Sequence, residues 1–371
     1  MNFKIYLTAF IGLCLISCSS NDDFIEEPNV ESFSFTAIGQ DLESLLEFTY
    51  NSETEQSQLV NLTSQLEING FFLTLRQVER TMSYYSFFNG SFSLALKDMD
   101  TGAIDLLPEI TINSIDKSIA WGTNSKETVH FGFFSPSGST SIGVRNINIT
   151  NSETNDLQIA FDAINFFEPL YHDQKLFISY RDLNEQNKVQ VYSLESQNFI
   201  RTLDFGNYSP SLLIDDEGNL AVIKSRLGID TELEIYNFDS LNLIETTAVN
   251  INSVFRAGAI NAALVDNKLY YEVQFTQPSP ITFGPAVFDI VDDEDNRVDL
   301  VSIINQVQSD MQNNVSITVQ GYSEINNQFY VGYVVSNTDE MDEGGVLVIS
   351  EEGQLIENIN VPFSPIYFLR D

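Results

Sequence analysis

Short runs in which apolar and polar residues alternate make up most of the chain after residue 31, and almost no stretch has the 3.6-residue period of an amphipathic helix. Alternation of this kind is typical of strands half buried on a sheet. Polar turn residues separate the runs, as in Asp-Asp-Glu-Gly at 215–218 and Val-Asp-Asn at 265–267. The pattern therefore predicts an all-β chain of antiparallel strands joined by tight turns.

The strands recur in a repeated unit. Residues 191–202 align with residues 235–246, so that Tyr192 matches Tyr236, 44 positions later. Both segments predict a strand, a turn and a second strand, which together form a hairpin. Weaker copies of this hairpin occur at residues 48–62, 96–105, 143–161, 287–301 and 346–359.

A second pair of strands precedes each hairpin, and the later strand of that pair is rich in aromatic residues. These runs lie at residues 82–88, 129–134, 176–180, 220–223, 269–275 and 329–335, of which 220–223 is aliphatic. Four strands per unit, at a period of roughly fifty residues, is the signature of β-propeller blades. The units are expected to begin near residues 70, 116, 165, 209, 258 and 317.

The two ends of the chain together supply one further blade. Three strands at residues 33–38, 45–50 and 59–62 have no partner before them, and a lone strand at 365–370 ends the chain. Pairing of the last strand with the first sheet would remove an exposed edge. We therefore expect seven four-stranded blades closed by the terminal strands. Two β-sandwiches divided near residue 165 are the alternative, which the regular spacing disfavours.

The repeated strand pattern resembles that of bacterial propellers with PQQ-like or YVTN-like repeats, over nearly all of residues 32–371. The resemblance implies the propeller fold but no particular activity, because no Trp-Asp repeat ending, paired-glycine kelch motif or sialidase box is present. The chain has one Trp. Repeated tryptophan docking, as in quinone-dependent dehydrogenases, is therefore excluded.

The first residues predict an export signal. A positively charged start is followed by an apolar run that ends in Leu15-Ile16-Ser17-Cys18, and the run is shorter than the ~20 residues of a membrane-spanning helix. This ending resembles the lipobox of bacterial lipoproteins, which implies a signal peptide at 1–17 and lipidation of Cys18. An ordinary secretory signal is the alternative.

The following residues 18–31 predict an acidic tether, similar to the leaders of Bacteroidota surface lipoproteins. That resemblance implies anchoring to the outer membrane by lipid, with the domain facing the cell surface or the periplasm.

Charge excludes several classes of function. The chain has 17 Lys and Arg against 53 Asp and Glu, a formal net charge of −36, and a pI near 4.1. Binding of nucleic acid by phosphate neutralisation needs clustered cations, so no nucleic-acid partner is expected. With two His and two Cys, most zinc sites are excluded as well.

An acidic run offers the best candidate metal site. Asp292, Asp293 and Asp295 present oxygen ligands of the kind that Ca²⁺ prefers, but the run lacks the glycine and closing glutamate of an EF-hand loop. A solvated hairpin tip is the favoured interpretation. We expect no cofactor, with Ca²⁺ as the possible exception.

Candidate ligand-binding residues lie in the segments predicted to connect blades or to join their second and third strands. Arginine beside an aromatic ring is a common way to hold a sugar, carboxylate or peptide. Cations are scarce in this chain, which draws attention to Arg181, Tyr208, Arg226, Phe255 and Arg256. The alternative is that each Arg pairs with a local carboxylate.

No catalytic residue can be assigned, because the chain has neither a Gly-x-Ser-x-Gly elbow nor a phosphate-binding loop. The sequence favours a non-enzymatic module that binds a protein or glycan partner. A carbohydrate-active hydrolase or lyase on the same scaffold is the alternative, and a Ca²⁺-loaded adhesion module is the weakest of the three.

Overall fold

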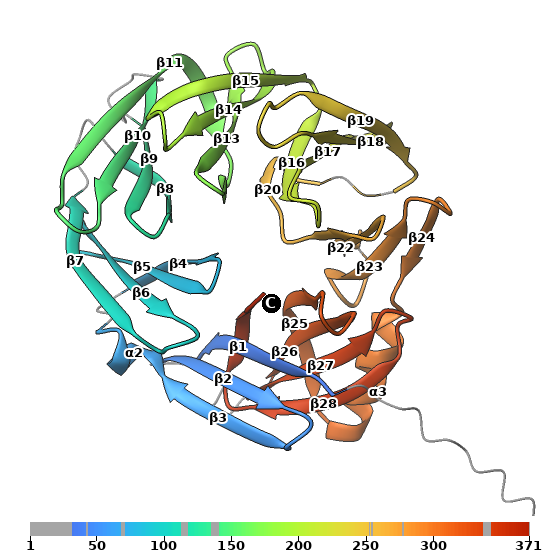
Figure 1. Ribbon diagram of the computed structural model, residues 1–371. Helices are drawn as coiled ribbons and strands as arrows, with labels where there is room; N and C mark the ends of the chain where they lie inside the picture. The colour runs from blue at the N-terminus through green and yellow to red at the C-terminus, as the bar shows by residue number, and fades with distance from the viewer. Residues whose placement is uncertain are drawn as a thin grey trace, which may run out of the picture. The chain divides into compact units, whose positions relative to one another are not determined.

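A computed structural model describes residues 32–41, 44–67, 71–112, 118–134, 141–251, 253, 255–276, 278–336 and 343–370. The predicted signal peptide, Cys18 and the tether lie outside these residues. Phe33–Asp371 form one compact unit, in which seven four-stranded blades surround a central axis (Figure 1). The predicted all-β propeller is therefore confirmed.

The blades are named in ring order, and the strands of each run from the axis outward. The closing blade contains β29 (Ser364–Phe368), β1 (Ser34–Gln40), β2 (Leu45–Asn51) and β3 (Gln56–Asn61). The second contains β4 (Phe71–Val78), β5 (Thr81–Phe88), β6 (Ser91–Asp98) and β7 (Ile104–Ile112); the third contains β8 (Ser118–Asn124), β9 (Thr128–Phe134), β10 (Ser141–Asn148) and β11 (Thr154–Phe166).

The remaining blades follow the same order. The fourth contains β12 (Leu170–His172), β13 (Lys175–Asp182), β14 (Asn187–Ser193) and β15 (Asn198–Gly206); the fifth contains β16 (Ser209–Ile214), β17 (Leu220–Arg226), β18 (Ile229–Tyr236) and β19 (Leu243–Val249). The sixth contains β21 (Ala263–Val265), β22 (Lys268–Gln274), β23 (Phe283–Asp289) and β24 (Glu294–Arg297); the seventh contains β25 (Asn314–Ser323), β26 (Gln328–Ser336), β27 (Gly344–Ser350) and β28 (Leu355–Val361).

The two ends of the chain meet in the closing blade, as predicted. Strand β29 pairs antiparallel with β1, so that Ala37 lies opposite Phe368 and Ile38 opposite Tyr367. The ring of Phe368 packs 6.2 Å from that of Phe35. Strand β29 thus covers the inner edge of β1, which would otherwise present unpaired backbone groups.

The hydrophobic core consists of seven clusters, one between each pair of neighbouring blades. Alternate side chains of one strand serve both neighbours: in β26, Phe329 and Val331 face the sixth blade, whereas Tyr330 packs against the closing blade. Because both faces of a blade are buried, the second strand of each blade is nearly continuously apolar. All seven clusters lie within Phe33–Asp371, so this unit contains its own complete core.

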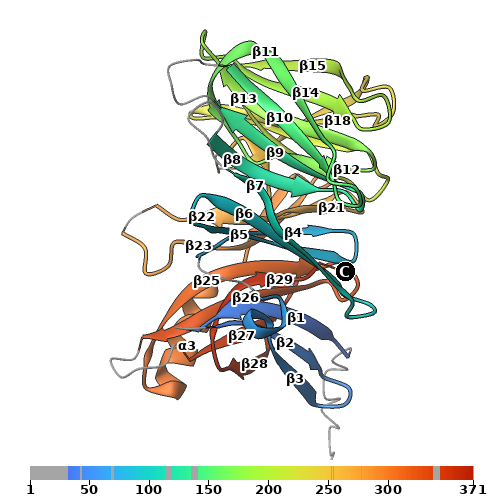
Figure 2. The same ribbon diagram turned by 90° about the vertical axis from the view of Figure 1, so that its left-hand side faces the viewer.

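The sixth blade departs from the prediction. Its outer strand β24 has four residues and is followed by α3 (Leu300–Met311), a helix that the sequence analysis did not anticipate. The helix lies beside β27 and β28 at the outer edge of the ring (Figure 2). Its apolar face, formed by Leu300, Ile303, Ile304 and Val307, packs in the cluster between the sixth and seventh blades.

Two boundaries near this blade also differ from expectation. The innermost strand of the sixth blade begins at Ala263, because β20 (Gly258–Ala259) pairs in parallel with β16 of the fifth blade. The seventh blade begins slightly earlier than the expected position near residue 317, because β25 begins at Asn314. The short helix α2 (Leu62–Gln65) links the closing blade to the second.

Candidate functional site

A cavity with a volume of about 930 Å³ lies along the ring axis. The inner strands of several blades and the link before β12 line it, and this size is within the range of ligand sites. We call it the central channel. Its polar lining includes Arg76, Gln77, Glu168, Asn261 and Arg370; its apolar lining includes Leu75, Leu170, Leu213, Ile366 and Tyr367.

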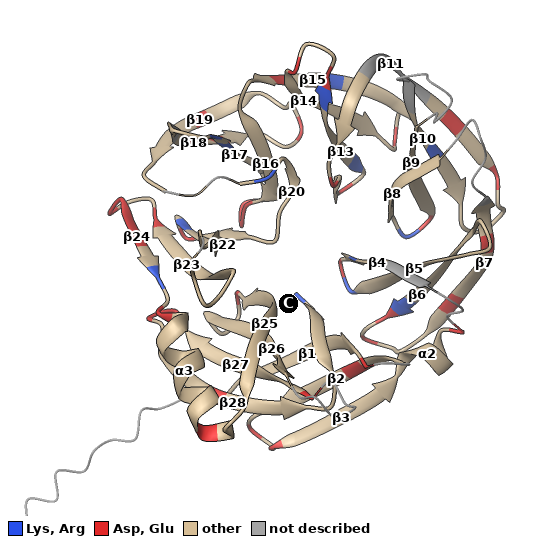
Figure 3. Cartoon of the chain, turned by 180° about the vertical axis from the view of Figure 1, so that it is seen from behind, with Lys and Arg blue, Asp and Glu red and all other residues tan. Residues whose placement is uncertain are grey.

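Three arginines line the central channel, although the chain is strongly acidic. Arg76 lies on β4, Arg256 precedes β20, and Arg370 follows β29. The picture coloured by charge shows basic segments at the C-terminal end and around the tip of the hairpin that β4 begins (Figure 3). Fixed positive charge therefore gathers at the axis of a negatively charged ring.

Polar contacts hold the end of the chain in the channel wall. The Gln77 amide donates to the backbone oxygen of Arg370 at 2.8 Å, and the backbone N–H of Arg370 donates back to Gln77 Oε1 at 2.8 Å. The Arg370 guanidinium donates to Asn261 Oδ1 at 2.9 Å. These bonds tie the closing blade to the second blade and orient Arg370.

Carboxylates also reach the channel. Glu168 forms an ion pair with Arg76 at 2.7 Å, and Glu79, Asp173 and Glu324 are exposed around the lining. Beside the channel, burial raises the pKa of Glu272 above its ordinary value, and the charge of Arg256 opposes that rise. The channel thus presents both signs of charge.

The two histidines lie in different surroundings. His172 lines the channel with its ring 5.2 Å from that of Phe238, and partial burial lowers its pKa. His130 is fully buried in β9, where Nδ1 lies 2.7 Å from Asn146 Oδ1 and burial lowers the pKa to about 4. His130 is therefore neutral at physiological pH and has a structural role.

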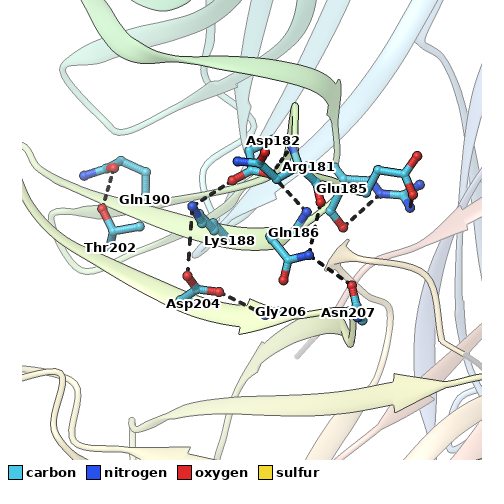
Figure 4. A network of polar contacts seen from close by, with 11 residues as sticks. Arg181, Asp182, Glu185, Gln186, Lys188, Gln190, Thr202, Asp204, Gly206 and Asn207 are labelled. Atoms are coloured by element: carbon cyan, nitrogen blue, oxygen red, sulfur yellow. Dashed lines mark hydrogen bonds and ion pairs between the residues drawn. The ribbon is translucent and has the colours of Figure 1, made fainter.

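The predicted ligand-binding residues do not converge. Arg256 alone among them lines the central channel. Arg181 pairs with Glu185 at 3.0 Å, beside a network in which Lys188 contacts Asp182 at 2.8 Å (Figure 4). This matches the alternative interpretation, in which the arginine pairs with a local carboxylate.

The other three candidates are placed as follows. Phe255 is buried with its ring 5.4 Å from that of Tyr271, so it has no free face for a ligand. Lys224 lies over the Tyr208 ring at 5.0 Å. Arg226 is exposed at the end of β17 and forms no ion pair with any described residue.

The candidate metal ligands lie at the outer hairpin of the sixth blade. Asp295 accepts a hydrogen bond from the Tyr271 hydroxyl at 2.6 Å and pairs with Arg297 at 2.8 Å. Asp293 occupies a turn position with φ of 54°. Within the described ranges, no group of three or more His, Cys, Asp or Glu side chains is arranged to hold a metal ion.

Sequence reasoning missed Arg76, Glu168 and Arg370. It searched the loops, whereas Arg76 lies within the innermost strand β4 and Arg370 directly follows β29. The signal available in the sequence was a charged residue in a strand predicted to face the axis. Which charged residues would meet across the ring depended on the closure of all seven blades.

No family model matches the chain, and no curated protein matches it. Among solved structures, 566 chains match. Puromycin hydrolase aligns at a TM-score of 0.51 with 10% identity, over 90% of this chain, which spans 54% of the length of that protein.

Two further matches have lower TM-scores. The β-propeller domain of the Trilobed protease from Pyrococcus furiosus, described as having an open velcro topology, aligns at 0.46 with 10% identity, covering 85% of this chain and 89% of that domain. TolB from Acinetobacter baumannii aligns at 0.43 with 11% identity, covering 92% and 83%. At such identities the likeness concerns the fold alone.

None of the helices in the described part of the chain has the length and apolar character needed to cross a membrane.

Proposed function

We propose that this protein is a lipid-anchored, extracytoplasmic β-propeller that binds a protein or glycan partner through its central channel. The partner would carry carboxylate groups, as acidic sugars and peptides do. The anchor would be Cys18 and the location the outer membrane, as the lipobox resemblance implies. The resemblance to PQQ-like and YVTN-like propellers is part of the same proposal.

The observation that carries the binding proposal is the placement of arginine. Three of the nine arginines line one cavity of about 930 Å³, together with Tyr171 and Tyr367. Guanidinium groups bind carboxylates by charge-assisted hydrogen bonds, and tyrosine rings supply faces for sugars or side chains.

A binding screen tests the proposal. The soluble unit, residues 32–371, is presented to acidic and neutral glycans and to cell-envelope extracts. We expect Arg256→Gln to weaken binding of the partner at least about tenfold, since one charge-assisted hydrogen bond contributes roughly 1.5–3 kcal/mol. Arg181→Gln is the matched control and should bind normally. Equal affinity of the Arg256 variant and the wild type would refute the channel as the site.

A carbohydrate-active hydrolase or lyase is the second candidate. Four carboxylates line the same cavity, namely Glu79, Glu168, Asp173 and Glu324. Glycoside hydrolysis needs two such groups flanking the bond to be broken. The test is whether the protein releases reducing ends from a bound glycan. Release that is abolished by changing one of the four carboxylates, Glu→Gln or Asp→Asn, would favour this function over binding alone.

The anchor is tested separately. Cys18→Ser should abolish incorporation of labelled palmitate in the full-length chain and should release the protein from the membrane fraction. If the Cys18→Ser protein incorporated no palmitate and still remained in the membrane fraction, a lipid at Cys18 would be excluded as the anchor. Digestion of intact cells by an added protease would distinguish surface exposure from a periplasmic location.

A further inference from the structure

A second cavity, of about 510 Å³, lies between the second and third blades. We call it the aromatic pocket. Its volume is within the usual range for small-molecule sites. Aromatic side chains make up most of its lining: Tyr85, Phe87, Phe92, Trp121, Phe131, Phe166 and Phe167.

Small residues and partial exposure keep this pocket accessible. Gly122 and Ala120 on β8 line it, and the side chain of Ala120 is exposed. The rings of Phe87, Phe166 and Phe167 are only half-buried. A concave surface of half-buried rings leaves apolar area in contact with water, and a planar apolar ligand would cover that area favourably.

The aromatic pocket adjoins the central channel, since Thr74, Arg76 and Glu168 line both cavities. The ion pair between Arg76 and Glu168 therefore lies where the two cavities meet. Arg76 Nε donates to the Gly122 carbonyl at 3.2 Å, and Nη1 donates to the Leu75 carbonyl at 3.0 Å. Nη1 also lies 2.7 Å from Glu168 Oε1. These contacts fix the guanidinium plane.

The same contacts leave two charged atoms unused. The contacts use Nε and Nη1 of Arg76 and Oε1 of Glu168, and among the described residues neither Arg76 Nη2 nor Glu168 Oε2 takes part in a hydrogen bond. One is a donor and the other an acceptor, on adjacent, oppositely charged groups. An α-amino acid presents the complement, since its carboxylate can accept from Nη2 and its ammonium can donate to Oε2.

We propose that the aromatic pocket binds a free aromatic α-amino acid, with the ring among the aromatic side chains and the zwitterionic group on Arg76 and Glu168. Burial of the ring selects against aliphatic amino acids, and the paired charges select against aromatic compounds with a single charge. Arg76 and Glu168 line both cavities, but the aromatic rings line the aromatic pocket alone, so binding of a free amino acid can be measured, and can fail, without the macromolecular partner proposed for the central channel.

Trp121 makes the site observable. It is the single tryptophan of the chain, and it lines the aromatic pocket with 8% of its surface exposed. Titration of residues 32–371 with L-phenylalanine should produce a saturable change in tryptophan emission, half complete below about 1 mM, the affinity expected of a few well-made contacts. No saturable change up to that concentration would refute the proposal.

Three related compounds test each part of the recognition. Phenethylamine lacks the carboxylate, phenylacetate lacks the ammonium group, and L-leucine lacks the ring. Each should bind at least about tenfold more weakly than L-phenylalanine, as expected for the loss of one charge-assisted hydrogen bond or of a ring's burial. Binding of phenethylamine or phenylacetate as tight as that of L-phenylalanine would refute the role of the ion pair.

Variants locate the site. Ala120→Phe should fill the entrance and abolish the emission change, and Glu168→Gln should weaken L-phenylalanine binding at least about tenfold. Arg80→Gln is the matched control, because Arg80 pairs with Asp100 at 3.0 Å and lines neither cavity. Undiminished binding by folded Ala120→Phe protein, verified by its melting temperature, would refute the location.

Discussion

The closing blade and the sixth blade both depart from the regular module, in opposite ways. The closing blade is built from the two ends of the chain, yet its strands β1, β2 and β3 contain seven, seven and six residues and pair continuously. The sixth blade is continuous in sequence, but its outer strand β24 has four residues and α3 follows it.

The difference separates two requirements for a stable ring. A blade needs its second and third strands, whichever part of the chain supplies them, because these strands are paired on both sides and bring apolar side chains to both neighbours. The innermost strand can be as short as three residues, as in β12 and β21. The outermost strand of a blade can be short. In the sixth blade, the helical face of Leu300 and Ile304 takes part in burying the cluster against the seventh blade.

The largest effect is expected from loss of the inner strand of the closing blade. Deletion of residues 364–371 removes β29 together with Phe368, and should destabilise the fold by more than the about 3–5 kcal/mol of a single core Phe→Ala change. Replacing residues 294–297 of β24 with a Gly-Ser segment should cost less. Urea denaturation measures both, and an equal loss would contradict the distinction between inner and outer strands.

A buried ion pair joins the closing blade to the second blade. Lys97 Nζ lies 2.8 Å from Glu47, and the side chains are 7% and 9% exposed. Lys97→Met should cost about 3–5 kcal/mol, because it leaves the Glu47 charge buried without a partner. The double change Glu47→Leu with Lys97→Met should recover most of that loss. A double variant no more stable than the single one in urea melts would disprove this account.

The helix of the sixth blade should contribute by its buried face alone. Leu300 is 1% exposed, and Leu300→Ala should lower the free energy of unfolding by about 2–5 kcal/mol. The exposed Gln306 provides the control, and Gln306→Ala should change stability by less than about 0.5 kcal/mol. Similar losses in both variants would contradict the role of the buried face, since alanine is the better helix former at either position and propensity cannot account for a loss.

The smallest effect concerns the start of the same helix. Asp299 accepts hydrogen bonds from the Ser302 N–H at 3.1 Å and the Ser302 hydroxyl at 2.6 Å, and these bonds lower the Asp299 pKa. Its contribution is therefore complete above the ordinary carboxyl pKa and is lost as the pH falls through the lowered value. Asp299→Ala should lower the melting temperature at pH 7 and make little difference near pH 2. A constant difference across this range would contradict the charged cap.

Much of the fold was predictable from the sequence because each blade carries its own pattern. The match of Tyr192 with Tyr236 predicted the repeated unit. The lone strand at residues 365–370 predicted the closure of the ring. Helix α3 was missed because it occurs once and lies outside the repeat, although its apolar residues at 300, 303, 304 and 307 have helical spacing.

The site was less predictable, because it depends on residues that meet only across the ring. Arg256 was named as a candidate from its loop, but Arg76 lies on the second blade and Glu168 on the link between the third and fourth blades. Their 2.7 Å contact depends on how these parts are placed in the closed ring. The same holds for the rings of Phe87 and Phe167, which line one pocket from distant segments. The alternation of apolar and polar residues indicates which face of a strand is buried, but it does not indicate which residues of another blade pack against that face.

The pairing of β29 with β1 sets an order of events during biosynthesis. Strand β1 is made early and β29 after all the other described strands, so the inner edge of β1 has no partner while the intervening six blades are being synthesised, which takes roughly tens of seconds at ordinary rates of translation. During that interval the nascent protein exposes a strand edge that could pair with another chain. Dependence on a holding chaperone would accordingly be greatest just before the final residues emerge.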